Sequence, residues 1–368
     1  IGGSQTLPDS PLLFFYSLAL YFGHRSAVEG NDRAWYGFGL ATGLAMLSKY
    51  SAFLILAGLG TYMLLTKSWH FLRSRHFWFS ILLSGLAFSP VIVWNAQNHW
   101  ASFLFQSARR AEEMSGFSPY NFGRYLVTQI LIVSPALWLV NWRALWIGLR
   151  VGLKESNRSV LFLAVFTLPF FLIFTLLSFF YWVKVNWLWP GYLCATVLTI
   201  LLAYHKRMQF WFKACLVSSV TVTGLSIFLL FYQPFAVNWP ENSLAGWKKL
   251  AERVEQMKNT RGGKWLAAGY EYKTASELAF YLPGQPETYS NTLIGRPGLQ
   301  YDFWFDAHRV LRKNFMFVVD RRYRLKDAPA VLSKFFSQVE SPDSLVVKSG
   351  RGYVTTFYIY PCYGYKGR

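Results

Sequence analysis

Most of the first 239 residues belong to apolar runs about as long as a lipid bilayer is thick. Since roughly 20 apolar residues in a helix cross the hydrocarbon core, these runs predict membrane-spanning helices and not the core of a water-soluble protein. The clear runs are Pro11–Phe22, Phe77–Trp94, Tyr125–Leu149, Val160–Trp182, Trp187–Tyr204 and Phe212–Tyr232.

Charged residues are distributed unevenly along the chain. Residues 1–239 hold 17 Lys/Arg and 6 Asp/Glu, whereas residues 240–368 hold 20 and 12. The second segment is about 25% charged, which is usual for a soluble domain. We therefore expect a transmembrane domain of helices over residues 1–239 and a soluble domain over residues 240–368.

The net charge of +19 does not by itself indicate a nucleic-acid partner. It is divided between the two segments as +11 and +8, and the basic residues of the first segment lie in short loops between apolar runs, as topology signals do. Anionic lipid or phosphate is the expected partner, and no nucleic acid is expected. The three cysteines form no CxxC pair or Cys/His cluster that would indicate zinc or redox chemistry.

The run from Trp35 to Thr66 is too long for one upright span and carries Lys49 near its middle. A lysine at the bilayer centre costs roughly 3 kcal/mol or more. Either this run is one long tilted helix, or it is a hairpin of two short helices with Lys49 at the turn.

Loop charges favour the hairpin. If the run is a hairpin and Asp9 lies outside, the inner loops 24–34, 67–76, 150–158 and 205–213 carry 11 Lys/Arg and the outer segments carry 5. A single helix would place three of the basic loops outside, against the positive-inside rule. The hairpin gives eight spans and places the soluble domain outside, on the same face as Asp9 and Lys49.

The soluble segment is expected to be a small α/β domain. Helical spacing covers Ser243–Lys258 and Thr274–Tyr281, and the strand-like runs are Trp265–Ala268, Phe315–Val319, Leu345–Val347 and Tyr353–Tyr360. Alternating helices and strands predict helices packed on a sheet. The segment has no GxGxxG motif and no phosphate loop.

Two ionisable residues at membrane segments are candidates for chemistry. Asp9 stands just before an apolar run, where it could act as a base, hold a metal ion or merely cap the helix. Lys49 could reach the headgroups or serve as a point charge for a phosphate. Ionisable residues within membrane segments are usually functional. A cation beside a departing phosphate and a carboxylate beside an attacking group would together support group transfer from a lipid phosphate.

Other polar residues fall on the same predicted outer face. Lys184 and Asn186 lie in a tight turn between two long spans, where they could bind phosphate and substrate or form an ordinary polar loop. Arg109 and Arg110 could meet an anionic headgroup or belong to a solvated face. The segment Trp94–Arg124 mixes aromatics and amides, which suits either a helix lying in the interface or an aromatic belt.

Four motifs resemble bacterial membrane glycosyltransferases of the protein O-mannosyltransferase superfamily, to which the lipid A aminoarabinose transferase is related. They are Leu7–Phe15, Gly43–Tyr50, Trp94–Asn98 and Lys184–Pro190, and two further segments of the soluble part, Ala275–Leu282 and Gly295–Trp304, resemble the bacterial branch.

The resemblance implies a GT-C fold, a polyprenyl-phosphate sugar donor and transfer on the periplasmic face of the bacterial inner membrane. Asp9 would then match the acidic residue of the family's second outer loop, and Lys49 would match the lysine that faces the donor phosphate. From the residues themselves we expect Asp9 to be catalytic, Lys49, Lys184, Arg109 and Arg110 to bind the donor phosphate, and Asn95, Asn98 and Asn186 to contact substrate. The acceptor would be a lipid, a glycan or a protein, no residue is assigned to a metal, and a divalent cation could take part. Such enzymes carry an acidic residue in an earlier outer loop, so we expect that N-terminal sequence is missing here.

Two functions of other classes fit the same pattern. A transporter or flippase for a lipid-linked substrate would show broken helices in two repeated halves. A non-catalytic membrane scaffold would use its outer domain to bind a partner, and its polar outer residues would be incidental.

Overall fold

The structure, a computed structural model, describes residues 7–109, 111, 114, 116–205, 207–232, 245–323, 327–349 and 352–367. It divides into two compact units, Ile1–Ser226 and Ile227–Arg368. The division falls within helix α11 (Gln209–Tyr232), whereas the expected boundary between residues 239 and 240 lies outside the described residues.

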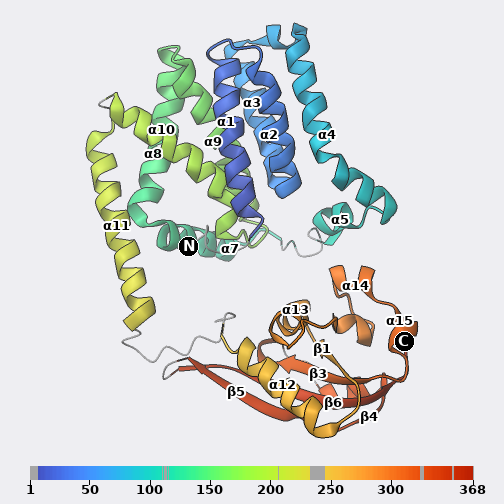
Figure 1. Cartoon of the computed structure of the whole chain (residues 1–368). Coiled ribbons are helices and arrows are strands. Elements are labelled where there is room, and N and C mark those ends of the chain that lie inside the picture. The colour runs from blue at the N-terminus through green and yellow to red at the C-terminus, as the bar shows by residue number, and fades with distance from the viewer. Residues whose placement is uncertain are drawn as a thin grey trace. The chain divides into compact units, whose positions relative to one another are not determined.

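The first unit is a bundle of helices that run back and forth (Figure 1). Its helices are α1 (Asp9–Ala27), α2 (Ala34–Ser48), α3 (Leu54–Thr66), α4 (Arg75–Gln97), α5 (Ala101–Leu104), α7 (Pro119–Val133), α8 (Pro135–Lys154), α9 (Arg158–Leu177), α10 (Trp189–Tyr204) and α11. Shorter turns are η2 (Tyr50–Phe53), η3 (Trp69–Arg73), the π-helical η4 (Phe105–Arg109) and η5 (Val185–Leu188). The end of the bundle at which α1 begins and α2 ends is called the Asp9 end below.

The expected hairpin is confirmed. Helix α2 ends at Ser48, and Lys49 has an extended backbone with φ −161° and ψ 135° before η2 and α3 continue the chain. The break places the lysine at the Asp9 end, where its ammonium avoids the cost of the bilayer centre.

The expected span over Tyr125–Leu149 is not one continuous helix. The chain bends by 106° between α7 and α8, and Ser134 at the bend has a positive φ of 85°. Pro135 explains the break, because a proline disfavours helical geometry in the preceding residue and lacks the N–H that would continue the helix. Ser134 Oγ then accepts a hydrogen bond from Leu137 N at 3.2 Å and caps α8.

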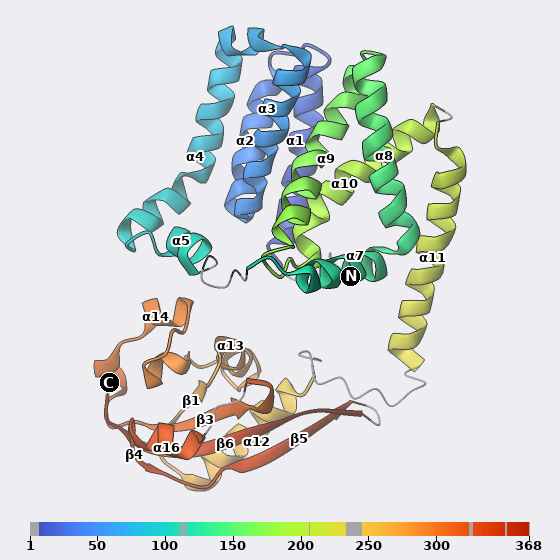
Figure 2. The same ribbon diagram turned by 180° about the vertical axis from the view of Figure 1, so that it is seen from behind.

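Helix α7 consequently lies across the Asp9 end of the bundle and does not run along its axis (Figures 1 and 2). Its residues Val127, Leu131 and Ile132 are more than half exposed. This is the arrangement of a helix in the membrane interface. The interfacial helix expected within Trp94–Arg124 is represented among the described residues only by the short turns α5 and η4 and by the first residues of α7.

The apolar exterior of the bundle requires lipid. Among the described residues, α4, α9 and the segment Val185–Tyr204 are each long and apolar enough to cross a membrane, and the bent α7–α8 pair passes the same test as one span. Only 22% of the most apolar window of α4 is buried inside the protein. An apolar helix exposed to this extent is stable in a bilayer and not in water. Because α2 and α3 have 15 and 13 residues, the total of eight spans stays a prediction.

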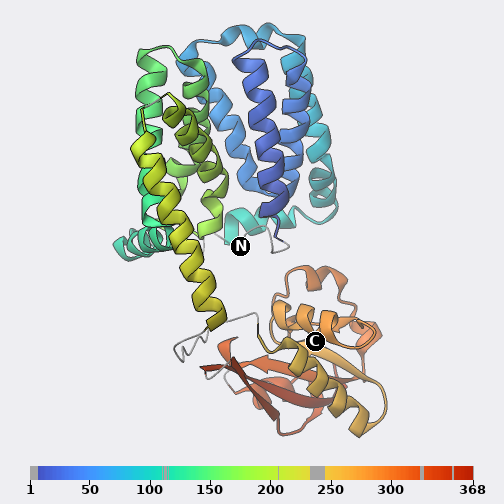
Figure 3. The same cartoon turned by 60° about the vertical axis from the view of Figure 1, so that its left-hand side comes forward.

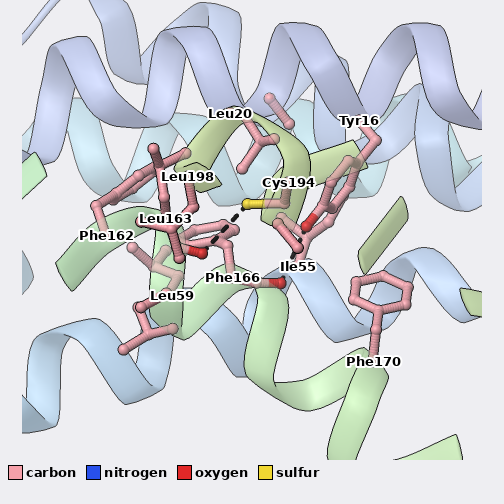
Figure 4. Packing of buried hydrophobic residues seen from close by; sticks show 14 of the residues in the cluster. Tyr16, Leu20, Ile55, Leu59, Phe162, Leu163, Phe166, Phe170, Cys194 and Leu198 are labelled. Atoms are coloured by element: carbon pink, nitrogen blue, oxygen red, sulfur yellow. Dashed lines mark hydrogen bonds between the residues drawn. The ribbon is translucent and has the colours of Figure 1, made fainter. Parts of the chain in front are cut away.

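The core of the bundle joins α1 to α9 and α10 (Figure 4). The hydroxyl of Tyr16 on α1 donates to the Phe166 carbonyl at 3.0 Å, and Cys194 Sγ on α10 donates to the Leu163 carbonyl at 3.2 Å. Tyr16, Phe166 and Cys194 are almost completely buried. These contacts tie α1 and α10 to the same helix, α9.

Helix α2 packs against α4 through small residues. A Cβ atom at Gly39 would lie 2.1 Å from the Ser80 carbonyl oxygen, and one at Gly43 would lie 2.5 Å from that of Ser84. The two backbones therefore approach as closely as they do in small-xxx-small helix pairs of membrane proteins. This contact holds the end of α2, and with it Lys49.

The second unit is an α/β sandwich. Its helices and turns are α12 (Trp247–Arg261), α13 (Tyr272–Tyr281), η6 (Asn291–Ile294), α14 (Gln300–Trp304), α15 (Ala307–Val310), η7 (Arg321–Tyr323) and α16 (Ala328–Ser333). Its strands are β1 (Trp265–Gly269), β2 (Thr288–Tyr289), β3 (Asn314–Asp320), β4 (Phe336–Val339), β5 (Asp343–Ser349) and β6 (Gly352–Tyr365). The sheet order is β2-β1-β3-β6-β4, with β5 also paired to β6. Strands β1, β2 and β3 are parallel, and β6 is antiparallel to its neighbours.

Two apolar clusters cover the two faces of this sheet. Helices α12 and α13 pack on one face, and η6, α15 and α16 pack on the other (Figure 3). All four expected strands and both expected helices are present, with shifted ends. The short strands β2 and β4 were not anticipated, because neither has enough residues to show an apolar alternation.

Candidate functional site

Asp9 is the first residue of α1 and is buried at the Asp9 end of the bundle. Its exposed fraction is 1%. The residue before the helix is Pro8, and no side chain caps the helix there. The alternative interpretation of the sequence, in which the Asp9 side chain caps the helix, is therefore wrong. The carboxylate instead meets side chains from two distant segments.

Lys49 supplies the first of these contacts. Its Nζ donates to Asp9 Oδ1 at 2.6 Å, which makes a close ion pair. The lysine side chain is 21% exposed and the aspartate side chain 2%. Burying two opposite charges is costly unless their geometry is good and their other polar atoms are bonded. The structure meets the second condition, because a side-chain amide bonds the other oxygen of the Asp9 carboxylate.

Asn186 supplies that amide. It lies in η5, just before α10, and its Nδ2 donates to Asp9 Oδ2 at 2.9 Å. Both carboxylate oxygens of Asp9 are therefore bonded, one to a cation and one to a neutral donor. The turn is held in place by Trp187, whose ring stacks on that of Tyr181 with centroids 5.8 Å apart. The three residues Asp9, Lys49 and Asn186 are called the Asp9 cluster below.

A second hydrogen-bond chain holds the turn that carries Lys49. The hydroxyl of Tyr50 lies 2.6 Å from Ser102 Oγ, which in turn donates to Asn95 Oδ1 at 2.9 Å. Asn95 is fully buried, and its Nδ2 donates to the Val91 carbonyl at 2.9 Å. No role was expected for Tyr50 or Ser102 from the sequence. The position of Tyr50 directly after Lys49 is a weak signal, and nothing in the sequence singles out Ser102.

Asn95 and Asn98 were expected to contact substrate, and both use their amides within the fold. The buried Asn95 also accepts a bond from Ser102 N at 3.1 Å, so it organises the start of α5. Asn98 Nδ2 donates to the Trp94 carbonyl at 2.8 Å. The structure does not bring either residue to the Asp9 cluster.

The remaining predicted cations are not part of the cluster. Lys184 precedes the turn with an exposed side chain that makes no hydrogen bond or ion pair with any residue the structure describes. Arg109 ends η4, with its side chain outside the described part, and Arg110 lies outside it entirely. Donor-phosphate binding by these three residues stays a prediction.

The side chains at the cluster do not suit a divalent cation. Such an ion requires several oxygen ligands, and the one carboxylate present is occupied by an ammonium and an amide. Among the described residues, no three His, Cys, Asp or Glu side chains group as a metal site requires. The arrangement can instead bind an anion at Lys49 and accept a proton at Asp9.

Comparison with known proteins finds a family match for the first quarter of the chain. A family model described as dolichyl-phosphate-mannose-protein mannosyltransferase matches residues 2–94, a segment that includes Asp9 and Lys49 but not Asn186. Over this segment the chain is similar to the membrane glycosyltransferase family that the sequence resembles, and the apolar helices agree with a membrane protein. No curated protein and no solved structure matches the chain significantly.

Proposed function

We propose that this protein transfers a monosaccharide from a polyprenyl-phosphate donor to a lipid, glycan or protein acceptor, with inversion at the sugar. The observation that carries the proposal is the buried Asp9 carboxylate, bonded to Lys49 at 2.6 Å and to Asn186 at 2.9 Å at one end of a membrane bundle. A buried ion pair is weak evidence for stability, and an ionisable group in a membrane segment is usually functional. The family match over residues 2–94 supports the same reaction class.

Lys49 is proposed to bind the donor phosphate. In the reaction, the bond between the anomeric carbon and the phosphate oxygen breaks, and its electron pair leaves with the phosphate. A fixed ammonium beside that oxygen stabilises the charge as it develops. The exposed fraction of 21% leaves part of the lysine side chain accessible to a headgroup.

Asp9 is proposed to accept the proton of the attacking group. The acceptor oxygen or nitrogen forms the new bond on the opposite face of the sugar, and its proton moves to the carboxylate. A carboxylate offers about four lone-pair positions, of which the hydrogen bonds from Lys49 and Asn186 occupy two. Asp9 can therefore orient Lys49 and still accept a proton.

The charge pattern supports action on the periplasmic side of a bacterial inner membrane. Basic loops gather at the end of the bundle opposite to Asp9, and the positive-inside rule assigns that end to the cytoplasm. The soluble second unit would then be periplasmic. Membrane lipids surround the bundle, and the donor enters the Asp9 cluster from the outer leaflet.

The transporter reading has less support. It requires broken helices in two repeated halves. Among the described residues, one helix pair is sharply bent, α7 with α8, and α7 lies across the Asp9 end of the bundle.

The experiment uses the full chain in nanodiscs with synthetic polyprenyl-phosphate sugars. Replacing Lys49 with Ala should lower kcat/KM by about 10²–10³-fold, as loss of one preorganised electrostatic contact does. Asp9→Ala should abolish transfer. Lys154→Ala, at the other end of the bundle, is the matched control and should keep normal turnover. Normal turnover in both the Lys49 and Asp9 variants would refute the proposal.

Asp9→Asn separates the two roles of the carboxylate. The amide keeps the shape of the side chain and can still accept from Lys49, but it cannot take a proton. If Asp9 is the base, Asp9→Asn should be as inactive as Asp9→Ala. Activity well above that of Asp9→Ala would show that the carboxylate only positions Lys49.

A further inference from the structure

The second unit exposes a set of large aromatic side chains on two neighbouring short helices. Tyr272 and Phe280 of α13 and Trp304 of α14 are 48%, 64% and 62% exposed. Tyr272 and Phe280 share one side of α13, since they are separated by about two turns, whereas Ala275 and Leu278 of the same helix are buried. These three exposed rings form what we call the aromatic patch.

Helices α13 and α14 are linked by a hydrogen bond, so the three rings belong to one continuous surface. The Tyr301 hydroxyl of α14 lies 3.1 Å from Ser276 Oγ of α13, and the Tyr301 ring packs edge-on against Trp304 with centroids 5.5 Å apart. Figures 1 and 2 show the two helices side by side at one edge of the sheet. An exposed aromatic group of this kind on a soluble domain usually marks an interaction site.

Positive charge accompanies the patch. Arg296, between the two helices in sequence, is exposed with its guanidinium 5.5 Å from the Tyr270 ring. The Arg309 side chain of α15 is 76% exposed, with its Nε 3.5 Å from the Asp306 carboxylate. The segment from residue 240 onward carries a net charge of +8. Rings such as Trp, Tyr and Phe with nearby Arg and Lys are typical of surfaces that enter the headgroup layer of anionic bilayers.

The chain itself keeps this unit near a bilayer. Only residues 233–244 separate the end of α11 at Tyr232 from the described start of the unit at Ala245. Even a fully extended chain of that length spans no more than about 45 Å. A lipid surface is therefore always within reach, and its effective concentration is high.

We propose that the aromatic patch docks the second unit onto the surface of the bilayer, with the rings at the headgroup level and the arginines against anionic lipid. This inference does not depend on sugar transfer. It rests on the exposed rings, the flanking cations and the short connection to α11.

The test measures the depth of spin labels in the full chain. The native cysteines Cys194, Cys215 and Cys362 are buried and should stay unlabelled in the folded protein. Phe280→Cys and Trp304→Cys each leave the other ring in place. Lys264→Cys is the control. Lys264 is exposed directly before β1, whereas α13 follows the opposite end of that strand.

Labelled protein is placed in nanodiscs with anionic or with neutral lipid, and collisions with oxygen and with a water-soluble nickel chelate are compared. Docking predicts that labels at 280 and 304 gain collisions with oxygen and lose collisions with the chelate, more so in anionic lipid, whereas the label at 264 stays open to the chelate. Equal access of the chelate at all three positions would overturn the proposal. Shielding from both reagents in every lipid would also overturn it, since it would mean that protein or saccharide covers the patch.

Discussion

Asn186 donates a hydrogen bond of 2.9 Å to Asp9 although 177 residues separate them in sequence. We propose that this bond makes Asn186 a positioning residue for the carboxylate, and its expected contact with substrate stays a prediction. Replacing it with aspartate would set two carboxylates side by side, and like charges at this distance cannot both ionise easily. We expect Asn186→Asp to lose more activity at neutral pH than Asn186→Ala.

The same variant should recover activity as the pH falls. Once the introduced carboxyl is protonated at lower pH, it can donate to Asp9 as the amide did. The measurement is the pH profile of kcat/KM for both Asn186 variants, with Asn31→Asp in a loop at the other end of the bundle as control. If Asn186→Asp and Asn186→Ala have parallel pH profiles, Asn186 does not act through Asp9.

Tyr50 should matter to activity through the position of Lys49. Tyr50→Phe removes the hydroxyl that lies 2.6 Å from Ser102 Oγ, at a cost of about 1 kcal/mol in stability. We expect a higher KM for the donor, because the turn that carries Lys49 is less well fixed, and little change in kcat. Tyr36→Phe makes the same chemical change at the other end of the bundle, where the hydroxyl bonds His76 at 2.7 Å. Equal donor KM values for the two variants would contradict the positioning role.

Hydropathy and loop charge predicted the hairpin at Lys49, because two independent arguments require a break there. A single helix would place a lysine at the bilayer centre, and it would place three basic loops outside. They could not predict the bend at Ser134, since apolar composition is continuous across it and a span and an interfacial helix look alike by hydropathy. Asp9 and Lys49 were each recognised as unusual for a membrane segment. Their pairing with each other and with Asn186 depends on the packing of α1, α2 and α10, which one sequence does not specify.

The contact between α2 and α4 should be intolerant of a single methyl group. A Cβ at Gly39 would lie 2.1 Å from the Ser80 carbonyl oxygen, so Gly39→Ala must push the helices apart. We expect a loss of about 1–3 kcal/mol or more, as for other overpacked contacts. Gly85→Ala on α4 is the matched control. Nothing lies within 4 Å of its added Cβ, so alanine should be neutral or stabilising.

Thermal unfolding of the two glycine variants in the same detergent measures this difference. A lower midpoint for Gly39→Ala than for Gly85→Ala is the expected order. Equal midpoints would mean that α2 and α4 do not pack in this register.

Acid should weaken the attachment of α12 to the sheet. Hydrogen bonds from Tyr363 and Arg261 hold the pKa of the Glu340 carboxyl below its ordinary value, and a hydrogen bond from Arg253 does the same for the pKa of Asp343. A lowered pKa in the folded state means that the stabilisation is present above the unfolded value of about 4. It is lost as the pH falls through the folded value. The second unit should therefore open more readily as the pH falls below this range.

The buried thiol of Cys362 reports this opening, because dithiodipyridine reacts with thiols at acidic pH. Glu340→Gln should raise the labelling rate of Cys362 at neutral pH and flatten its dependence on pH. Glu252→Gln, at an exposed carboxylate of α12, should behave as the unaltered protein does. A pH dependence of labelling that is unchanged in Glu340→Gln would show that this ion pair does not contribute to the acid response.

Asp9, Lys49 and Asn186 leave the ribosome in that order, so the cluster is completed in two stages of synthesis. Lys49 follows Asp9 by 40 residues and can neutralise its charge as soon as α1, α2 and α3 have entered the membrane. Asn186 arrives only with the start of α10. A nascent chain that stops after α8 would thus hold Asp9 and Lys49 as a neutral ion pair that can enter the membrane. The hydrogen bond from Asn186 would form only after the second half of the bundle has been translated and packed.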